Sequence, residues 1–153
     1  MNADEMFRSL TLESISITGL QAQLQQGVEA RGVECHAHVE FQLTPNQVEG
    51  AQPMLFVLQT RLSCVGTPLR GSNRSKLFDL EIRASANYRQ VGAGAIAVGD
   101  FATHHTVFAR HLFAALSLRA QSLLQDLGMQ NIRLPLDLPQ EVSAAQQGPV
   151  VLN

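Results

Sequence analysis

Five histidines are the side chains in this sequence that could most readily bind a metal ion or move a proton near neutral pH. His36 and His38 share one face of a predicted strand, where positions i and i+2 lie about 6.7 Å apart, a wide spacing for two ligands of one ion. His104 and His111 lie two helical turns apart, roughly 10.5 Å, and do not form a His-x-x-x-His pair. We therefore expect no bound metal and no other cofactor.

Motifs for nucleophilic catalysis and for phosphate binding are missing from the sequence. Cys35 and Cys64 each lie in a strand-like run at a position expected in the core, which favours reduced, buried thiols over a disulfide. There is no Gly-x-Ser-x-Gly elbow, and the small-residue segment Gly92–Asp100 contains no Gly-Lys-Ser/Thr motif. These observations predict that the protein is not an enzyme.

The composition is typical of one folded domain. The chain has 153 residues, of which 45% are hydrophobic and 16% charged, with a net charge of −2, and these values argue against disorder and against nucleic acid as a partner. We expect a single domain at residues 8–147, with flexible termini at residues 1–7 and 148–153. Because the sequence shows neither a secretory signal nor an apolar run of roughly 18 residues, we expect a cytoplasmic protein that does not insert into membranes.

Alternating apolar and polar residues are the main signal of secondary structure in the first two thirds of the chain. They predict four antiparallel strands at residues 8–18, 33–43, 54–65 and 77–91. The clearest run has apolar side chains at every second position from Val33 to Leu43. Each strand is therefore expected to bury one face.

The connections between these strands are less regular. In the first strand the apolar parity changes between Leu12 and Ile15, which predicts a bulge near Glu13–Ser14. Residues 19–32 lack a sustained strand alternation and are expected to form a connection. The turn-rich residues 44–53 are long for a hairpin and are expected to cross to another position in the sheet.

A long helix is predicted at residues 103–127, which contain neither Gly nor Pro. Asp100 or Thr103 can cap its start, and Gly128 can take the left-handed conformation that ends it. A broad apolar stripe is expected to lie on the sheet, and it comprises Phe101, Phe108, Leu112, Ala115, Leu116, Leu123 and Leu127. A second, narrower stripe is expected to contact another subunit, and it comprises Val107, Ala114 and Leu118.

Strands that come first and a helix that comes last predict an α+β domain, in which a four-stranded antiparallel sheet carries the long C-terminal helix on one face. After the helix, Ile132, Leu134, Leu136 and Leu138 alternate as an extended apolar arm. Residues 139–147 could form a short terminal helix.

The chain has more apolar residues than one helix is expected to cover, which indicates an exposed groove for partners. We place this groove between residues 44–53, the third and fourth strands and residues 128–138. The side chains expected to contact a bound polypeptide are Leu43, Val48, Met54, Phe56, Met129 and Leu134.

The order of the elements and three short motifs resemble the SecB family of protein-export chaperones. The motifs are Leu112-Phe113-Ala114-Ala115 in the helix, Phe78–Ile82 leading to Tyr88 in the fourth strand, and Gly128–Leu138 after the helix. This resemblance implies an ATP-independent holdase that captures unfolded or precursor polypeptides. It also implies a homotetramer built as a dimer of dimers.

The same resemblance implies that acidic residues on the outer sheet face dock on a SecA-type export motor. Asp79 and Glu81 fit this role, but Ser14 and Thr18 stand where the family has acidic residues in the first strand. Fewer carboxylates favour weaker docking. Some SecB-like proteins instead guard the antitoxin of a toxin–antitoxin pair, and this is an alternative function for the chain.

A hot-dog-type acyl thioesterase is the alternative from another class, because that fold also pairs a long helix with an antiparallel sheet. Its central helix precedes most of its strands, whereas the predicted helix here follows them. A plain oligomeric scaffold is a third hypothesis.

Overall fold

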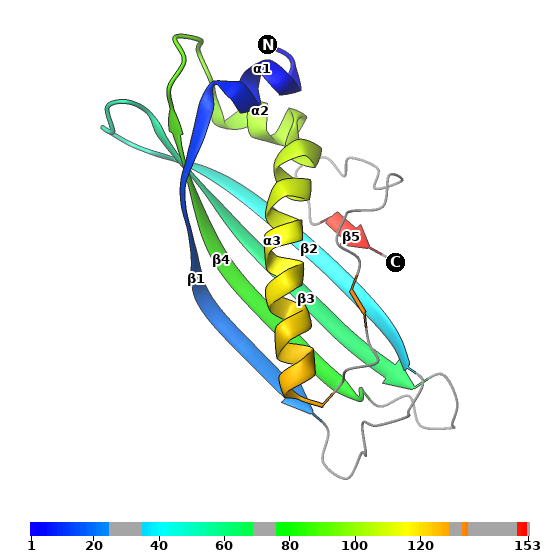
Figure 1. Ribbon diagram of the computed structural model, residues 1–153. Helices are drawn as coiled ribbons and strands as arrows, with labels where there is room; N and C mark the ends of the chain where they lie inside the picture. The colour runs from blue at the N-terminus through cyan, green and yellow to red at the C-terminus, as the bar shows by residue number, and fades with distance from the viewer. Residues whose placement is uncertain (25–34, 69–75, 129–132, 135–149, 153) are drawn as a thin grey trace.

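The computed structural model describes residues 1–24, 35–68, 76–128, 133–134 and 150–152. Its elements are, in chain order, α1 (Ala3–Arg8), β1 (Leu10–Leu24), β2 (Cys35–Val48), β3 (Leu55–Pro68), β4 (Phe78–Gln90), α2 (Val98–Thr103), α3 (His105–Asp126) and β5 (Val150–Leu152). Neighbouring strands are antiparallel and follow the order β1-β4-β3-β2-β5. Figure 1 shows α3 lying along one face of this sheet. The predicted α+β architecture is confirmed, with β5 as an additional short strand.

The sheet has an inner face, which carries α3, and an outer face. On β4 every second residue is buried, and these residues are Phe78, Leu80, Ile82, Ala84, Ala86 and Tyr88. On β3 the buried residues are Phe56, Leu58, Thr60, Leu62, Cys64 and Gly66. The buried parity predicted for these strands is therefore confirmed. Met54, expected on the same face, instead precedes β3 and is exposed.

The connection between β2 and β3 differs from the prediction. Residues 44–48 continue β2 and pair with residues 55–59 of β3, so the two strands form a hairpin and the chain does not cross the sheet. Gly50 supplies a left-handed residue in the turn, with φ of 76°. Pro45, which suggested a turn, is tolerated because β2 is the outermost of the four long strands on its side of the sheet.

β1 is longer than predicted because it contains two irregularities. The register against β4 shifts between Leu12 and Ser14, which confirms the predicted bulge, and shifts again between Ile17 and Gly19. The expectation of a connection at residues 19–32 is therefore wrong for residues 19–24, which pair with β4. Each shift moves the side-chain parity by one position, so that the apolar residues stay on one face along the whole strand.

The long helix is interrupted near its start. α2 ends at Thr103 and α3 begins at His105, where a single helix is predicted. Asp100 does cap, but within α2, because its carboxylate accepts a hydrogen bond from the Ala97 N–H at 2.7 Å. Gly128 has φ of 82° directly after the helix, as predicted. No helix in the described part of the chain is long and apolar enough to cross a membrane.

The buried face of α3 overlaps the predicted stripe only in part. Its buried residues are Phe108, Ala109, Leu112, Phe113, Leu116, Ser117, Ala120 and Leu124. Ala115 is exposed and Leu123 and Leu127 are half-buried. The helix face that packs on the sheet is therefore rotated about the helix axis relative to the predicted apolar stripe.

The structure of the N-terminus differs from the sequence prediction. Residues 1–7 were expected to be a flexible terminus and Arg8 to begin the first strand, but Ala3–Arg8 forms α1. This helix has a capping box in which the Asn2 and Glu5 side chains each accept from the other's backbone N–H. Met6 is fully buried, and the Phe7 ring lies 5.6 Å from the Phe108 ring of α3. These contacts fix the helix on the domain.

An aromatic cluster joins the sheet to the helices. The Phe101 ring of α2 lies 4.9 Å from both the Phe56 ring of β3 and the Phe108 ring of α3. The Tyr88 ring of β4 meets Phe108 edge to face at 5.4 Å. Such contacts add to the burial of large apolar area, so this end of the two-layer core is well fixed.

Candidate functional site

The described residues among those predicted to contact a polypeptide do not form one groove. Leu43 is half-buried on the inner face of β2. Phe56 is fully buried against Phe101, so it belongs to the core and its assignment to a groove wall is wrong. Leu134 is also buried, and its backbone N–H donates to the Gln121 side-chain oxygen of α3 at 2.8 Å. This bond holds the start of the arm on the helix.

Val48 and Met54 lie at the exposed turn end of the hairpin, close to Phe56 in the register. Val48 pairs with Leu55, the residue that follows Met54. The side chains of Val48 and Met54 are both exposed. The two residues therefore lie near each other at the surface. Met129 lies outside the described residues.

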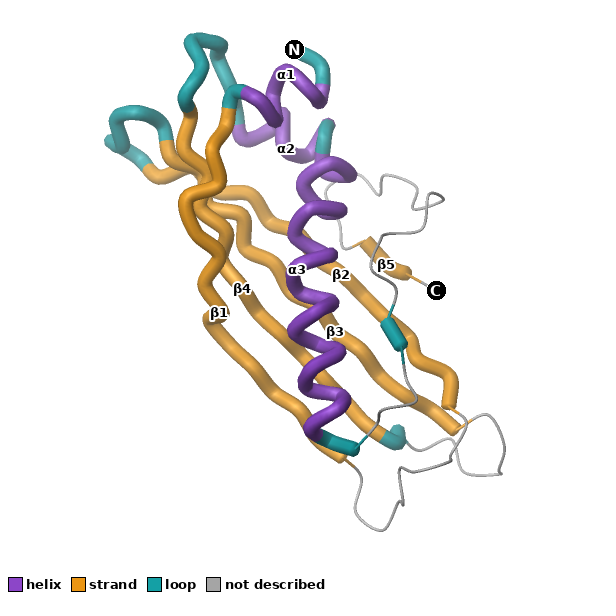
Figure 2. The backbone as a smooth tube through the Cα atoms, viewed as in Figure 1, coloured by secondary structure: helices purple, strands orange, loops and turns teal. Residues whose placement is uncertain are grey.

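One edge of the sheet is partly covered by the chain's own end. Val150–Leu152 pairs antiparallel with Val39–Phe41 of β2, although these last residues were expected to belong to a flexible terminus. Figure 2 shows β5 beside β2, across the sheet from β1. Among the described residues, the remainder of this edge, 35–38 and 42–48, has no strand partner. β2 therefore presents backbone groups that can accept a further strand.

The other edge carries an apolar strip that the sequence did not assign to the surface. Ile15, Ile17 and Leu20 lie on the inner face of β1, yet their exposed fractions are 36%, 40% and 48%. α3 packs on β2, β3 and β4, which leaves this strip open. The alternation of Leu20, Ala22 and Leu24 is the signal that could have extended the strand prediction. We call Ile15, Ile17 and Leu20 the β1 strip.

The second helical stripe is at the surface, as its assignment to an interface requires. Leu118 is 62% exposed, and Val107 and Ala114 are half-buried. A leucine this exposed on a long helix is an apolar group that a partner could cover. We call Val107, Ala114 and Leu118 the α3 stripe.

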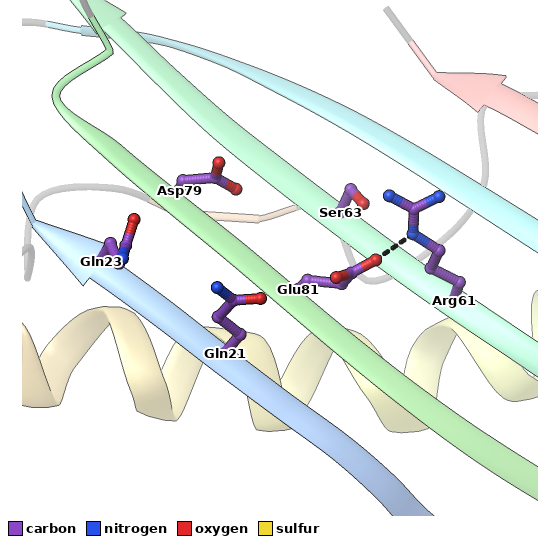
Figure 3. Close-up of a pocket in the computed structure, with 6 residues that line it drawn as sticks. All are labelled: Gln21, Gln23, Arg61, Ser63, Asp79 and Glu81. Carbon is purple, nitrogen blue, oxygen red and sulfur yellow. Dashed lines mark hydrogen bonds and ion pairs between the residues drawn. The ribbon is translucent and has the colours of Figure 1, made fainter.

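The acidic residues predicted to dock on a motor protein already have basic partners. The Glu81 carboxylate accepts from Arg61 through Nε, and Arg83 Nη2 lies 3.5 Å from the same oxygen. The Glu81 side chain is only 18% exposed. Lys76 Nζ lies 3.4 Å from the Asp79 carboxylate. Figure 3 shows Asp79, Glu81 and Arg61 on the outer face, with the helix on the far side of the sheet.

A separate ion pair ties the edge strand to its neighbour on this face. Arg89 of β4 donates through Nε and Nη2 to the two carboxylate oxygens of Glu13, the bulge residue of β1. The hydrogen bond to Glu13 raises the pKa of Arg89 above its usual range. Arg89 also donates to the Pro53 carbonyl at 3.2 Å, so one side chain links β1, β4 and the hairpin turn.

Three of the histidines contact polar groups of the chain. His38 Nε2 lies 3.3 Å from a Glu40 carboxylate oxygen. His104 Nε2 lies 3.2 Å from the Met1 carbonyl oxygen, and His105 Nδ1 lies 2.9 Å from the Ala102 carbonyl oxygen. Within the described ranges, no group of three His, Cys, Asp or Glu residues is placed to hold a metal ion.

Comparisons with known proteins identify the fold. No protein-family model matches the sequence, and no curated protein matches it. Among solved structures, a similar chain is the SecB-like chaperone Rv1957 of Mycobacterium tuberculosis, in complex with a ChAD peptide from the HigA1 antitoxin. The TM-score is 0.66 at 14% sequence identity, over 87% of this chain and 94% of that one. The SecB-like fold implied by the sequence resemblance is therefore confirmed.

Proposed function

We propose that this protein is an ATP-independent chaperone, a holdase, that binds extended segments of unfolded or precursor polypeptides along the open edge of β2. The observation that carries the proposal is β5: an apolar segment, Val150–Leu152, pairs with that edge in the chain's own structure. A non-native polypeptide exposes the same backbone groups and apolar side chains. The likeness to a SecB-like chaperone in complex with a peptide supports this function.

Two kinds of contact would hold such a segment. Main-chain hydrogen bonds to β2 are independent of the client's sequence, which suits a chaperone with many clients. Apolar side chains of the client would meet Leu43 on the inner face and Val48 and Met54 at the hairpin end. Each buried side chain contributes about 1.5–3 kcal/mol. Useful affinity therefore needs several contacts along one chain, so long unfolded chains should bind better than short peptides.

The first test is suppression of aggregation of a slowly refolding protein, without nucleotide. Val151→Pro removes a backbone donor from β5 and should release it from β2, so the variant should protect more strongly than the parent. Val151→Thr keeps the donor and the strand propensity and serves as the matched control. A parent that does not retard aggregation refutes the holdase function, and equal protection by both variants refutes the β2 edge as the site.

A second variant tests the exposed apolar residues. Val48→Ser with Met54→Ser changes two surface side chains and should weaken protection while the protein stays folded. Phe56 is left intact because its replacement would disrupt the aromatic core.

A dedicated chaperone of one antitoxin is the second candidate, favoured by the antitoxin peptide in the similar structure. The two candidates differ in client range. A general holdase is displaced from one client by any unrelated unfolded chain in excess, whereas a dedicated chaperone is not. Competition between a labelled unfolded protein and unrelated unfolded chains separates them.

A role in protein export would require that the chaperone deliver its clients to a SecA-type motor. Such delivery requires free carboxylates on the outer face, and Glu81 and Asp79 are both paired with cations. Direct binding to such a motor, lost in a Glu81→Gln and Asp79→Asn variant, would support an export role.

We also infer that the chain forms a homotetramer, a dimer of dimers. Such an assembly needs two different interfaces, and the β1 strip and the α3 stripe are separate exposed apolar surfaces that can supply them.

A further inference from the structure

The outer face of the sheet is hollowed near its centre. A shallow cavity of about 450 Å³ crosses β2, β3 and β4, and its lining includes Gln42, Thr44, Gln59, Arg61, Arg83 and Ser85. Two smaller hollows adjoin it, and both are lined in part by Glu81. The floor of this surface offers hydroxyl, amide and guanidinium groups.

Two arginines face each other across this hollow. Arg61 of β3 and Arg83 of β4 are directly opposite in the register, an arrangement in which like charges repel. Both contact the same Glu81 oxygen, so among the described residues one carboxylate serves two cations and one positive charge has no carboxylate of its own. Arg89, on the same face, has a carboxylate of its own in Glu13.

The uncompensated charge is accessible. The Arg83 side chain is 61% exposed and the Arg61 side chain 44%, whereas Glu81 is largely covered. A guanidinium has five N–H donors in a planar fork, so each arginine can bind a second carboxylate while it keeps Glu81.

We propose that the Arg61–Glu81–Arg83 cluster is a docking surface for an acidic segment of a partner protein, with one carboxylate held between the two guanidinium groups. A guanidinium binds a carboxylate through two parallel N–H groups, which gives the contact a defined geometry. The neighbouring Thr44, Gln59 and Ser85 side chains can hydrogen-bond the peptide groups on either side of that carboxylate. The partner proposed here is acidic, whereas a motor protein that docks on Glu81 and Asp79 would have to be basic at its contact surface.

The charge of the site favours a peptide carboxylate over other anions. One uncompensated positive charge matches a single carboxylate, whereas a phosphate group carries about −1.5 to −2 at neutral pH. The chain's net charge of −2 does not provide the basic footprint that a nucleic acid needs. The hollow also crosses β2, β3 and β4, which leaves room for neighbouring peptide groups.

The test measures binding of a labelled peptide in which Asp alternates with Ser and Gly, by fluorescence anisotropy at low salt. Arg83→Gln should weaken binding roughly three-fold, as expected for one exposed ion pair. Glu81→Gln should strengthen it by a similar factor, because both arginines lose their internal partner. Arg119→Gln, which removes an exposed charge from α3, is the matched control and should leave binding unchanged.

Each other outcome overturns the proposal. Weaker binding in Glu81→Gln, or equal loss in Arg119→Gln, would show that the cluster is not the site. Equal binding of a peptide with Asn in place of Asp would exclude a carboxylate. Competition by inorganic phosphate but not by unlabelled peptide would indicate a site for free anions. The holdase assay with Arg83→Gln is independent, because Arg83 lies on β4, which β3 separates from the β2 edge. Failure here therefore leaves the proposed function standing.

Discussion

Tyr88 places a polar atom inside the core. Its ring packs against Phe108, and its hydroxyl is buried with no hydrogen-bond partner in the described part of the chain. Burial raises the pKa of Tyr88 above its usual value, because the charged phenolate is poorly solvated there. A buried hydroxyl without a partner costs about 1–3 kcal/mol.

Tyr88→Phe should therefore stabilise the fold, by about 1 kcal/mol in denaturant unfolding. In the parent, the unfolded chain releases the phenolic proton near pH 10 while the folded chain retains it. The parent's free energy of unfolding should therefore fall as the pH rises above about 10, and this contribution should be absent in the variant. Destabilisation by Tyr88→Phe would show that the hydroxyl has a partner.

Single residues also show what alternation alone cannot decide. Met54 and Phe56 are two positions apart and were expected to be equally available to a client. Phe56 lies within β3 and meets Phe101, whereas Met54 precedes the strand at an exposed turn. Alternation indicates which residues share a face, but only the tertiary packing determines which of them a helix covers.

At the level of elements, the predicted strands and the long helix are present because their periodicity matches their burial. The errors concentrate at the connections. Residues 44–48 contain Pro45 and Asn46, which favour turns, yet they pair with β3, because the neighbouring strand compensates a weak local preference. The end of β1 was missed because a second bulge, after Ile17, again changed its parity.

Gly66 and Phe78 show how closely two strands can fit. They are opposite each other in the register of β3 and β4, and a methyl group on Gly66 would overlap the Phe78 ring. Gly66→Ala should lower the free energy of unfolding by about 1–3 kcal/mol, the usual cost of overpacking. Thermal and denaturant unfolding measure this change.

Gly99→Ala is the control for that substitution. Gly99 lies in α2, and a methyl group there meets nothing within 4 Å. Because alanine favours helix over glycine by about 0.8–1 kcal/mol, this variant should be neutral or more stable. If Gly66→Ala left the free energy of unfolding unchanged, the Phe78 ring would have to move aside without cost.

At the level of the whole molecule, the β1 strip and the α3 stripe lie on different elements. The β1 strip lies on an edge strand, where backbone groups are also free to pair, and the α3 stripe lies on the helix that covers the sheet. The sequence indicated the second through helical periodicity. It did not indicate the first, because the exposure of Ile15, Ile17 and Leu20 follows from which strands α3 covers.

If the β1 strip and the α3 stripe form separate interfaces, a substitution in either one should dissociate the tetramer into dimers. We expect the parent protein to be a tetramer by light scattering at micromolar concentrations. Leu118→Glu should leave dimers joined through the β1 strip, and Ile17→Glu should leave dimers joined through the α3 stripe, because a buried, unpaired carboxylate opposes each contact.

The double variant should be monomeric and still folded, since both side chains are exposed in the isolated chain. Gln23→Glu adds the same charge to β1 on the outer face and should leave the tetramer intact. A monomeric parent would contradict the assembly as a whole. If Leu118→Glu alone gave monomers, the helices would form every interface and the β1 strip would be free for another partner. Stepwise dissociation through two different dimers is the result that only a dimer of dimers with these two contacts produces.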